Sequence, residues 1–140
     1  MNLREVGDLN LLTALIWGEA RGEPFDGMMA VGFVARNRVR SPQWGGNYPD
    51  VILQPKQFSC MSIEDTNHHE VLKALLPSRN GNWQNEVWRE CRFAAQGVLG
   101  NWRRDITNGA NHYHSVQISP YWAHKQEICY RVGNHFFYKL

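Results

Sequence analysis

A glutamate at the end of the first apolar helical pattern is the residue best placed for chemistry in this sequence. Leu12, Leu15 and Ile16 recur at the three- and four-residue spacings that share one helix face, and Glu19 continues the same stripe. Pro24 disfavours helical geometry just before it, so we expect the helix to end there and Glu19 to lie on its last turn. The sequence therefore predicts a core-facing carboxyl beside a loop, where a cleft could form.

The predicted surroundings of Glu19 favour its protonated form. The negative end of the helix dipole disfavours a charge there, and burial beside Ile16 and Trp17 disfavours it further. A glutamate whose pKa is raised to about 6–7 can donate a proton to a leaving oxygen at neutral pH, as glycosidic cleavage requires. Glu23 is the competing acid, but its place before Pro24 suits an exposed or capping role. In the ordinary alternative, Glu19 is a structural acid paired with an arginine: Arg21, Arg36 or Arg38.

Several blocks of the sequence match one known family. The most specific is Gly18-Glu19-Ala20-Arg21-Gly22-Glu23-Pro24, and the others are 30–32, 37–39, 51–59, 109–114 and 131–138. Together they resemble the SleB-type cell wall hydrolases, the group named for spore-cortex-lytic enzymes and also found as phage endolysins. Only 64–89 matches poorly. The resemblance implies a lysozyme-like fold and cleavage of peptidoglycan glycan strands, with Glu19 as the catalytic acid and no metal or other cofactor.

The number of carboxylates in the cleft decides the expected reaction. Hydrolysis by the usual routes needs a second carboxylate, about 5–5.5 Å away for retention or about 6.5–9.5 Å for inversion. Only Glu23 and Asp26 are obvious sequence neighbours, and neither is convincingly directed inward. A lone acid is sufficient if the muramic sugar closes a 1,6-anhydro ring on itself. The family resemblance also favours such a lytic transglycosylase, and a hydrolytic muramidase using the same acid is the alternative.

Polar and aromatic side chains downstream are candidates for substrate binding. Gln57 could hydrogen-bond an N-acetyl or hydroxyl group of a sugar, while Phe58 supplies an apolar wall. Aromatic and imidazole rings later in the chain could stack on the sugars or hydrogen-bond to them. The complete set of candidates is Glu23, Gln57, Phe58, Tyr113, His114 and Trp122.

Two alternatives use the same residues differently. His112 and His114 would face one side of a strand, and with His124 they could bind zinc in a peptidoglycan amidase or peptidase. The sequence has no HExxH motif, however, and its three cysteines are not arranged as complementary ligands. We expect these cysteines to be reduced thiols: Cys60, Cys91 and Cys129. The other alternative is a module that binds the wall through its aromatic residues without cleaving it.

The elements expected to position these residues are mainly helical. Periodicity predicts helices at about 9–20, with Asp8 as N-cap, and at about 24–40. A short helical turn capped by Asp50 and an extended stretch over 54–59 follow. Two more helices are predicted at 64–76, stopped by Pro77, and from about Trp83 to Gly100, with a turn over 78–81 between them.

The last third of the sequence has a different pattern. Segments 111–115 and 131–138 are predicted as partner strands of a small antiparallel sheet. We therefore predict an α+β fold: a mainly helical single catalytic domain, residues 1–140, with a small sheet late in the chain. A chain of this length leaves no room for a separate wall-binding domain.

Composition limits the possible partners. The net charge of +2 suits an anionic polymer such as the bacterial wall but not a nucleic-acid binder, and we interpret Arg36, Arg38, Arg40, Arg103 and Arg104 as solvated helix faces or ends. Neither a signal peptide nor a run of about 18–20 apolar residues is present. We expect a monomer without membrane insertion, made in the host cytoplasm and acting on the wall after release. This favours a phage lysis enzyme.

Overall fold

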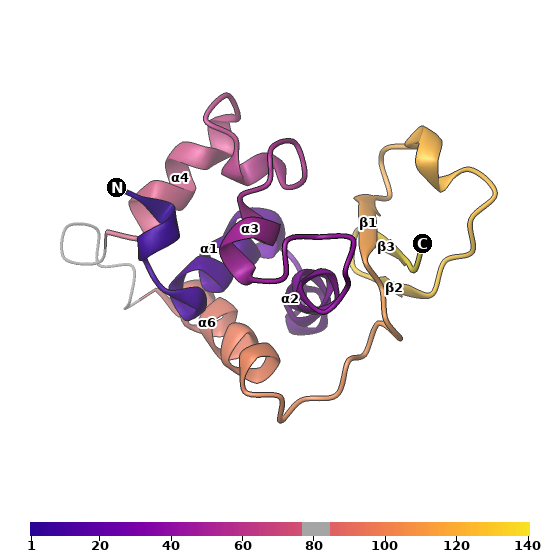
Figure 1. Ribbon diagram of the computed structural model, residues 1–140, viewed down its shortest axis with the longest axis horizontal. Helices are drawn as coiled ribbons and strands as arrows, with labels where there is room; N and C mark the ends of the chain where they lie inside the picture. Colours follow the sequence, from indigo (N-terminus) through magenta and orange to yellow (C-terminus); the bar gives the residue numbers. More distant parts are fainter. Residues whose placement is uncertain (77–84) are drawn as a thin grey trace.

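The computed structural model describes residues 1–76 and 85–140, so the predicted stop at Pro77, the 78–81 turn and the helix start at Trp83 lie outside the described residues. Helices precede a small sheet along the chain (Figure 1). The longer elements are α1 (Asp8–Ala20), α2 (Phe25–Val39), α3 (Tyr48–Ile52), α4 (Thr66–Ala74), α6 (Glu86–Leu99), β1 (His112–Ser115), β2 (Tyr130–Val132) and β3 (His135–Tyr138). Short 3-10 turns occupy Leu3–Glu5, Ser59–Met61 and Tyr121–Ala123.

Helix α1 is the centre of the helical part and packs against α2, α3, α4 and α6. Its residues from Leu11 to Ile16 are all buried, so the single apolar stripe predicted for this helix was too narrow. A helix that is apolar all round is one enclosed by other elements. The predicted N-cap was also wrong, because the helix begins at Asp8 and Gly7 occupies the cap position. The carboxy-terminal end of α1, with Glu19, emerges from this core.

A close helix contact fixes where α1 lies relative to the 59–61 turn. A Cβ atom added to Gly18 would come within 2.6 Å of Cys60 Sγ and 2.8 Å of a Val71 methyl carbon. Glycine at this position therefore lets the end of α1 approach both the turn and α4. Cys60 is buried in this contact, and all three cysteines of the chain are free thiols.

The sheet has three antiparallel strands in the order β1-β3-β2, and Figure 1 shows it to one side of the helical part, beside α2. The prediction of a single strand over 131–138 was wrong, because this segment forms a hairpin of β2 and β3. Gly133 has φ +55° at the turn, which breaks the strand where a left-handed backbone is needed. In β1, Tyr113 pairs with Phe137 and His114 with Phe136.

Smaller differences from the predicted elements lie between α2 and α4. Asn47, not Asp50, caps α3. Residues 54–58 form bends and turns rather than extended chain, with Lys56 at φ +66°. Helix α4 is shorter than expected because Asp65 caps it, accepting a hydrogen bond from the Asn67 backbone N–H at 2.7 Å. No helix within 1–76 or 85–140 is both long and apolar enough to cross a membrane.

Candidate active site

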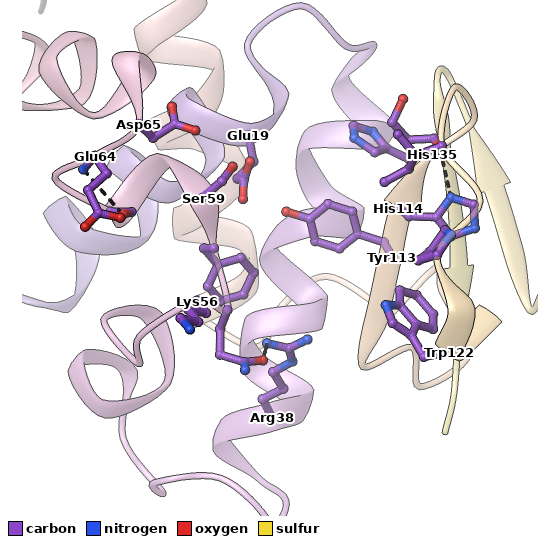
Figure 2. A pocket seen from close by; sticks show the side chains of 16 residues that line it. Glu19, Arg38, Lys56, Ser59, Glu64, Asp65, Tyr113, His114, Trp122 and His135 are labelled. Atoms are coloured by element: carbon purple, nitrogen blue, oxygen red, sulfur yellow. Dashed lines mark hydrogen bonds between the residues drawn. The ribbon is translucent and has the colours of Figure 1, made fainter.

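A cleft of about 620 Å³ lies between the helical part and the sheet. Glu19 and the 56–65 segment line its helical side, and Figure 2 shows Tyr113, His114, Trp122 and His135 on the opposite side. Of the seven predicted site residues, six line this cleft: Glu19, Gln57, Phe58, Tyr113, His114 and Trp122. Residues from five separate segments of the sequence therefore meet around one space.

The Glu19 carboxyl is partly buried at the last turn of α1. Burial raises its pKa from the ordinary 4.5 to about 7, the Tyr113 hydroxyl lowers it in part, and the negative charge of Asp65 raises it. At neutral pH a substantial fraction of Glu19 is therefore protonated. A carboxyl with this pKa can both donate a proton and take one back.

Tyr113 is the cleft residue directly across from this acid (Figure 2). Its ring stacks on Phe58 at a centroid distance of 6.4 Å and meets the edge of His135 at 5.2 Å. By distance and angle the buried Tyr113 hydroxyl forms no hydrogen bond within the described part of the chain, but it lies near enough to the Glu19 carboxyl to lower that group's pKa. Burial raises the pKa of this phenol well above its ordinary value, so it stays a neutral donor.

Arg38 lines the cleft and is buried. Arg36 is buried as well, so the prediction that these two arginines are solvated was wrong. Arg38 is 4% exposed, and its guanidinium lies 5.1 Å from the ring centroids of both Phe58 and Trp44. Its Nε donates to the Asn111 carbonyl at 2.8 Å, and an Nη donates to the Gln57 side-chain oxygen at 3.2 Å. Gln57 can therefore offer a substrate its amide N–H group, while Arg38 stays fixed by the protein.

Glu23 has a largely buried side chain that is paired with groups of the sheet, so the prediction of an exposed or capping Glu23 was wrong. Its side chain is only 7% exposed, and Oε1 accepts the Asn134 backbone N–H at 2.8 Å. The same oxygen lies 2.7 Å from His135 Nδ1, and burial is the main cause that lowers the pKa of this histidine. Glu23 thus joins the α1–α2 connection to the β2–β3 turn. It also lines, with Glu19, an adjoining cavity of about 290 Å³.

The predicted histidine ligands do not form a zinc site. The rings of His112 and His114 both contact Trp122, at 5.1 and 5.7 Å. Both nitrogens of His114 are already engaged, Nδ1 with the Ser115 carbonyl at 2.7 Å and Nε2 with the Tyr138 hydroxyl at 2.8 Å. Within 1–76 and 85–140, no group of three or more His, Cys, Asp or Glu side chains is arranged so that it could hold a metal ion. These contacts make His114 a support for the aromatic wall.

Two acids that were not predicted also line the cleft, Glu64 and Asp65. Asp65 followed by a helical pattern is an N-cap signal, which locates the start of α4 but not its place beside Glu19. That place depends on Asn67, whose side-chain amide donates to the Gly18 carbonyl at 2.5 Å. Arg21 adds a second tie by donating to the Asn67 side-chain oxygen at 2.7 Å. Glu23 and Asp26, the obvious sequence neighbours of Glu19, are therefore not the only acids near it.

Comparisons with known proteins show the family to which this chain is similar. The profile of the Cell Wall Hydrolase family matches residues 22–138, beginning three residues after Glu19. A spore cortex-lytic enzyme of Oceanobacillus iheyensis is 36% identical over 137 residues, covering 94% of this chain and 41% of the relative. Another, from Halalkalibacterium halodurans, is 28% identical over 134 residues, covering 93% and 34%. The chain thus spans between one third and about two fifths of the length of these relatives.

Solved structures share the fold. The catalytic domain of the Bacillus cereus SleB protein superimposes with a TM-score of 0.68 at 25% identity, covering 94% of this chain and 89% of that one. The catalytic domain of the germination-specific lytic transglycosylase SleB from Bacillus anthracis gives 0.67 at 24% identity, covering 94% and 93%. These matches confirm the predicted fold class, mainly helical with a small antiparallel sheet late in the chain.

Proposed function

This chain belongs to the Cell Wall Hydrolase family, and we propose that it cleaves the glycan strands of peptidoglycan with Glu19 as the general acid. One observation carries the proposal: a carboxyl with a pKa of about 7 lies in a cleft of about 620 Å³. Tyr113 and Trp122 give this cleft partly exposed aromatic surfaces on which sugar rings can stack, and the buried Phe58 packs against Tyr113. The relatives named as spore cortex-lytic enzymes support the same substrate.

The proposed reaction is a lytic transglycosylation between MurNAc and GlcNAc. Glu19 donates its proton to the glycosidic oxygen, the bond from MurNAc C1 to that oxygen breaks, and GlcNAc leaves with a C4 hydroxyl. The C6 hydroxyl of the same MurNAc then bonds to C1 and returns its proton to the Glu19 carboxylate. The product is 1,6-anhydro-MurNAc, no water is consumed, and Glu19 ends protonated as it began. A pKa of about 7 suits both proton transfers.

Asp65 supports a second candidate, a hydrolytic muramidase with the same acid. Its carboxylate lines the cleft and is close enough to Glu19 to raise that residue's pKa. In this alternative Asp65 would activate a water molecule that attacks C1, as the base of an inverting enzyme does. Asp65 Oδ1 already accepts the Asn67 backbone N–H at 2.7 Å. We favour transglycosylation because this capping bond already occupies one oxygen of the Asp65 carboxylate.

Mass spectrometry of digested sacculi distinguishes the two reactions. Transglycosylation yields muropeptides lighter by one water molecule than their hydrolytic counterparts. The Asp65→Asn variant should keep producing these anhydro fragments, since Asp65 transfers no proton in that reaction. Fragments ending only in reducing MurNAc, and lost in Asp65→Asn, would instead establish the muramidase.

We also propose that the protein is a monomeric phage endolysin, made in the host cytoplasm and acting on the wall after release. Its family resemblance to endolysins motivates this role. Expression inside a bacterial host should cause no lysis until the membrane is permeabilised, and rapid lysis afterwards. Lysis of intact cells before permeabilisation would contradict the proposed route. Sedimentation of the purified protein tests the monomer.

A further inference from the structure

The Tyr113 hydroxyl is a buried polar group that meets no partner at hydrogen-bond geometry within 1–76 or 85–140, although it lies near enough to the Glu19 carboxyl to lower that group's pKa. It has essentially no solvent exposure, and its ring is held by Phe58, His135 and Phe137 at centroid distances of 6.4, 5.2 and 5.5 Å. An unpaired buried hydroxyl destabilises the fold, since it has lost water without gaining a partner. Figure 2 shows it directed across the cleft toward the side that holds Glu19.

Glu19 requires a hydrogen-bond donor at one point of the proposed reaction. After it donates its proton, it is an anion in a partly buried site, where a poorly solvated charge is unfavourable. It must persist in that form until the C6 hydroxyl of the substrate gives a proton back. A neutral donor nearby would stabilise the anion without fixing it permanently in the charged form.

We propose that Tyr113 is a positioning residue whose hydroxyl donates a hydrogen bond to the Glu19 carboxylate between its acid and base steps. This inference rests on the proposed function and explains how Glu19 passes from its acid step to its base step. Tyr113 acts through Glu19 and transfers no proton of its own. The Tyr113 O–H bond stays intact, and only its hydrogen bond forms when Glu19 is charged and weakens when Glu19 is protonated.

Neither Arg38 nor Asp65, two other charged groups at the cleft, performs this task. Arg38 on α2 is held by the Asn111 carbonyl and the Gln57 side chain. Asp65 repels a charged Glu19 rather than stabilising it. The full set facing this space comprises Arg38 from α2, Lys56, Cys60, Glu64 and Asp65 from the 56–65 segment, and Tyr113, His114 and His135 from the sheet.

Tyr113 and Asp65 therefore act on Glu19 with opposite sign. The Tyr113 donor favours the carboxylate and lowers the Glu19 pKa, whereas the Asp65 charge favours the protonated acid and raises it. A cation in place of Tyr113 would keep Glu19 ionised and prevent the acid step. The pair instead leaves both protonation states accessible near neutral pH.

The decisive experiment is a ¹³C NMR titration of the Glu19 carboxyl in the full chain without substrate, its signal assigned by its loss in Glu19→Gln. Tyr113→Phe should raise the Glu19 pKa by about one unit, a tenfold change in the ionisation constant. Asp65→Asn should lower it. Tyr130→Phe is the matched control, because Tyr130 lies on β2 and contacts the same Phe137 at 5.9 Å. It should leave the Glu19 pKa unchanged.

Kinetics on sacculi separate this role from a structural one. In Tyr113→Phe, kcat should fall with little change in KM, the alkaline limb of the pH profile should move upward with the Glu19 pKa, and the thermal midpoint should not fall. If that variant folds poorly, 3-fluorotyrosine placed at position 113 is a stronger donor and should lower the Glu19 pKa.

The titration also keeps this inference distinct from the proposed function. An unchanged Glu19 pKa in Tyr113→Phe, or an equal rise in Tyr130→Phe, overturns the inference whatever the lytic activity. A wild-type protein that leaves sacculi intact would overturn the proposed function even if the Glu19 pKa responds to Tyr113.

Discussion

Replacing Glu19 with Gln should stabilise the protein at alkaline pH and not at acidic pH. The amide keeps the shape of the side chain but cannot ionise, so it removes the unfavourable burial of a charge. In the wild type the Glu19 pKa is about 7 in the folded protein, against an ordinary value of 4.5. The folded state therefore binds more protons than the unfolded state between these values, and wild-type stability falls as the pH rises through that window.

The size of this effect follows from the two pKa values. The difference between 4.5 and about 7 corresponds to about 3 kcal/mol of unfolding free energy, reached above the folded-state pKa and constant beyond it. For a domain of 140 residues this is a shift on the order of 10 °C in the thermal midpoint. Near pH 4.5 the two proteins should differ little.

The assay is urea and thermal unfolding of wild type and Glu19→Gln from about pH 4.5 to about pH 8.5, a range that brackets both pKa values. Glu70→Gln is the control, because it removes an exposed carboxylate on α4 and should leave no such pH-dependent gain. A stability difference between Glu19→Gln and wild type that does not change with pH would refute the reasoning. A less stable Glu19→Gln at every pH would indicate a structural ion pair instead.

Three further outcomes follow from particular contacts. Glu23→Gln should lower the unfolding free energy by about 1–3 kcal/mol, because it weakens the contacts with Asn134 and His135. Its lytic rate should stay within a few-fold of wild type. A folded but inactive Glu23→Gln would transfer the acid's role to Glu23. Gly18→Ala should cost about 1–3 kcal/mol in urea unfolding, because its Cβ would overlap Cys60. Gly22→Ala, whose Cβ meets nothing within 4 Å, is its control, and equal effects would contradict the packing argument. Dialysis against a strong chelator should leave the lytic rate unchanged, since both His114 nitrogens are engaged; activity lost and regained with zinc would restore the amidase alternative.

Local patterns predicted the helices around the acid well. The α1 end, the α2 span and the late sheet follow from periodicity, Pro24 and strand signals close together in the sequence. The β2–β3 hairpin was missed because its turn depends on a single left-handed residue, Gly133. Periodicity also underestimated how much of α1 is buried. Where a helix is packed on all sides, its apolar residues do not form one stripe that identifies the buried face.

The site residues were predictable only where a family motif identified residues that lie far apart in the sequence. The family resemblance singled out Glu19 and the Tyr113-His114 segment, although 94 residues separate Glu19 from Tyr113. Glu23 was misjudged because its partner Asn134 lies 111 residues away. Arg38 was misjudged because a helical arginine usually faces water, whereas here aromatic rings cover it. Asp65 reaches the cleft through Asn67, a contact that no local pattern encodes.

The most direct test of the central claim is the release of soluble fragments from purified sacculi by wild type and Glu19→Gln at equal folded concentration. Without a proton to donate, Glu19→Gln should lose activity by a factor of about 10²–10⁴ while keeping its circular dichroism spectrum. Wild type should clear the suspension, which a module that only binds the wall would leave turbid. A folded Glu19→Gln that retains most of the lytic rate would contradict the assignment of Glu19 as the acid.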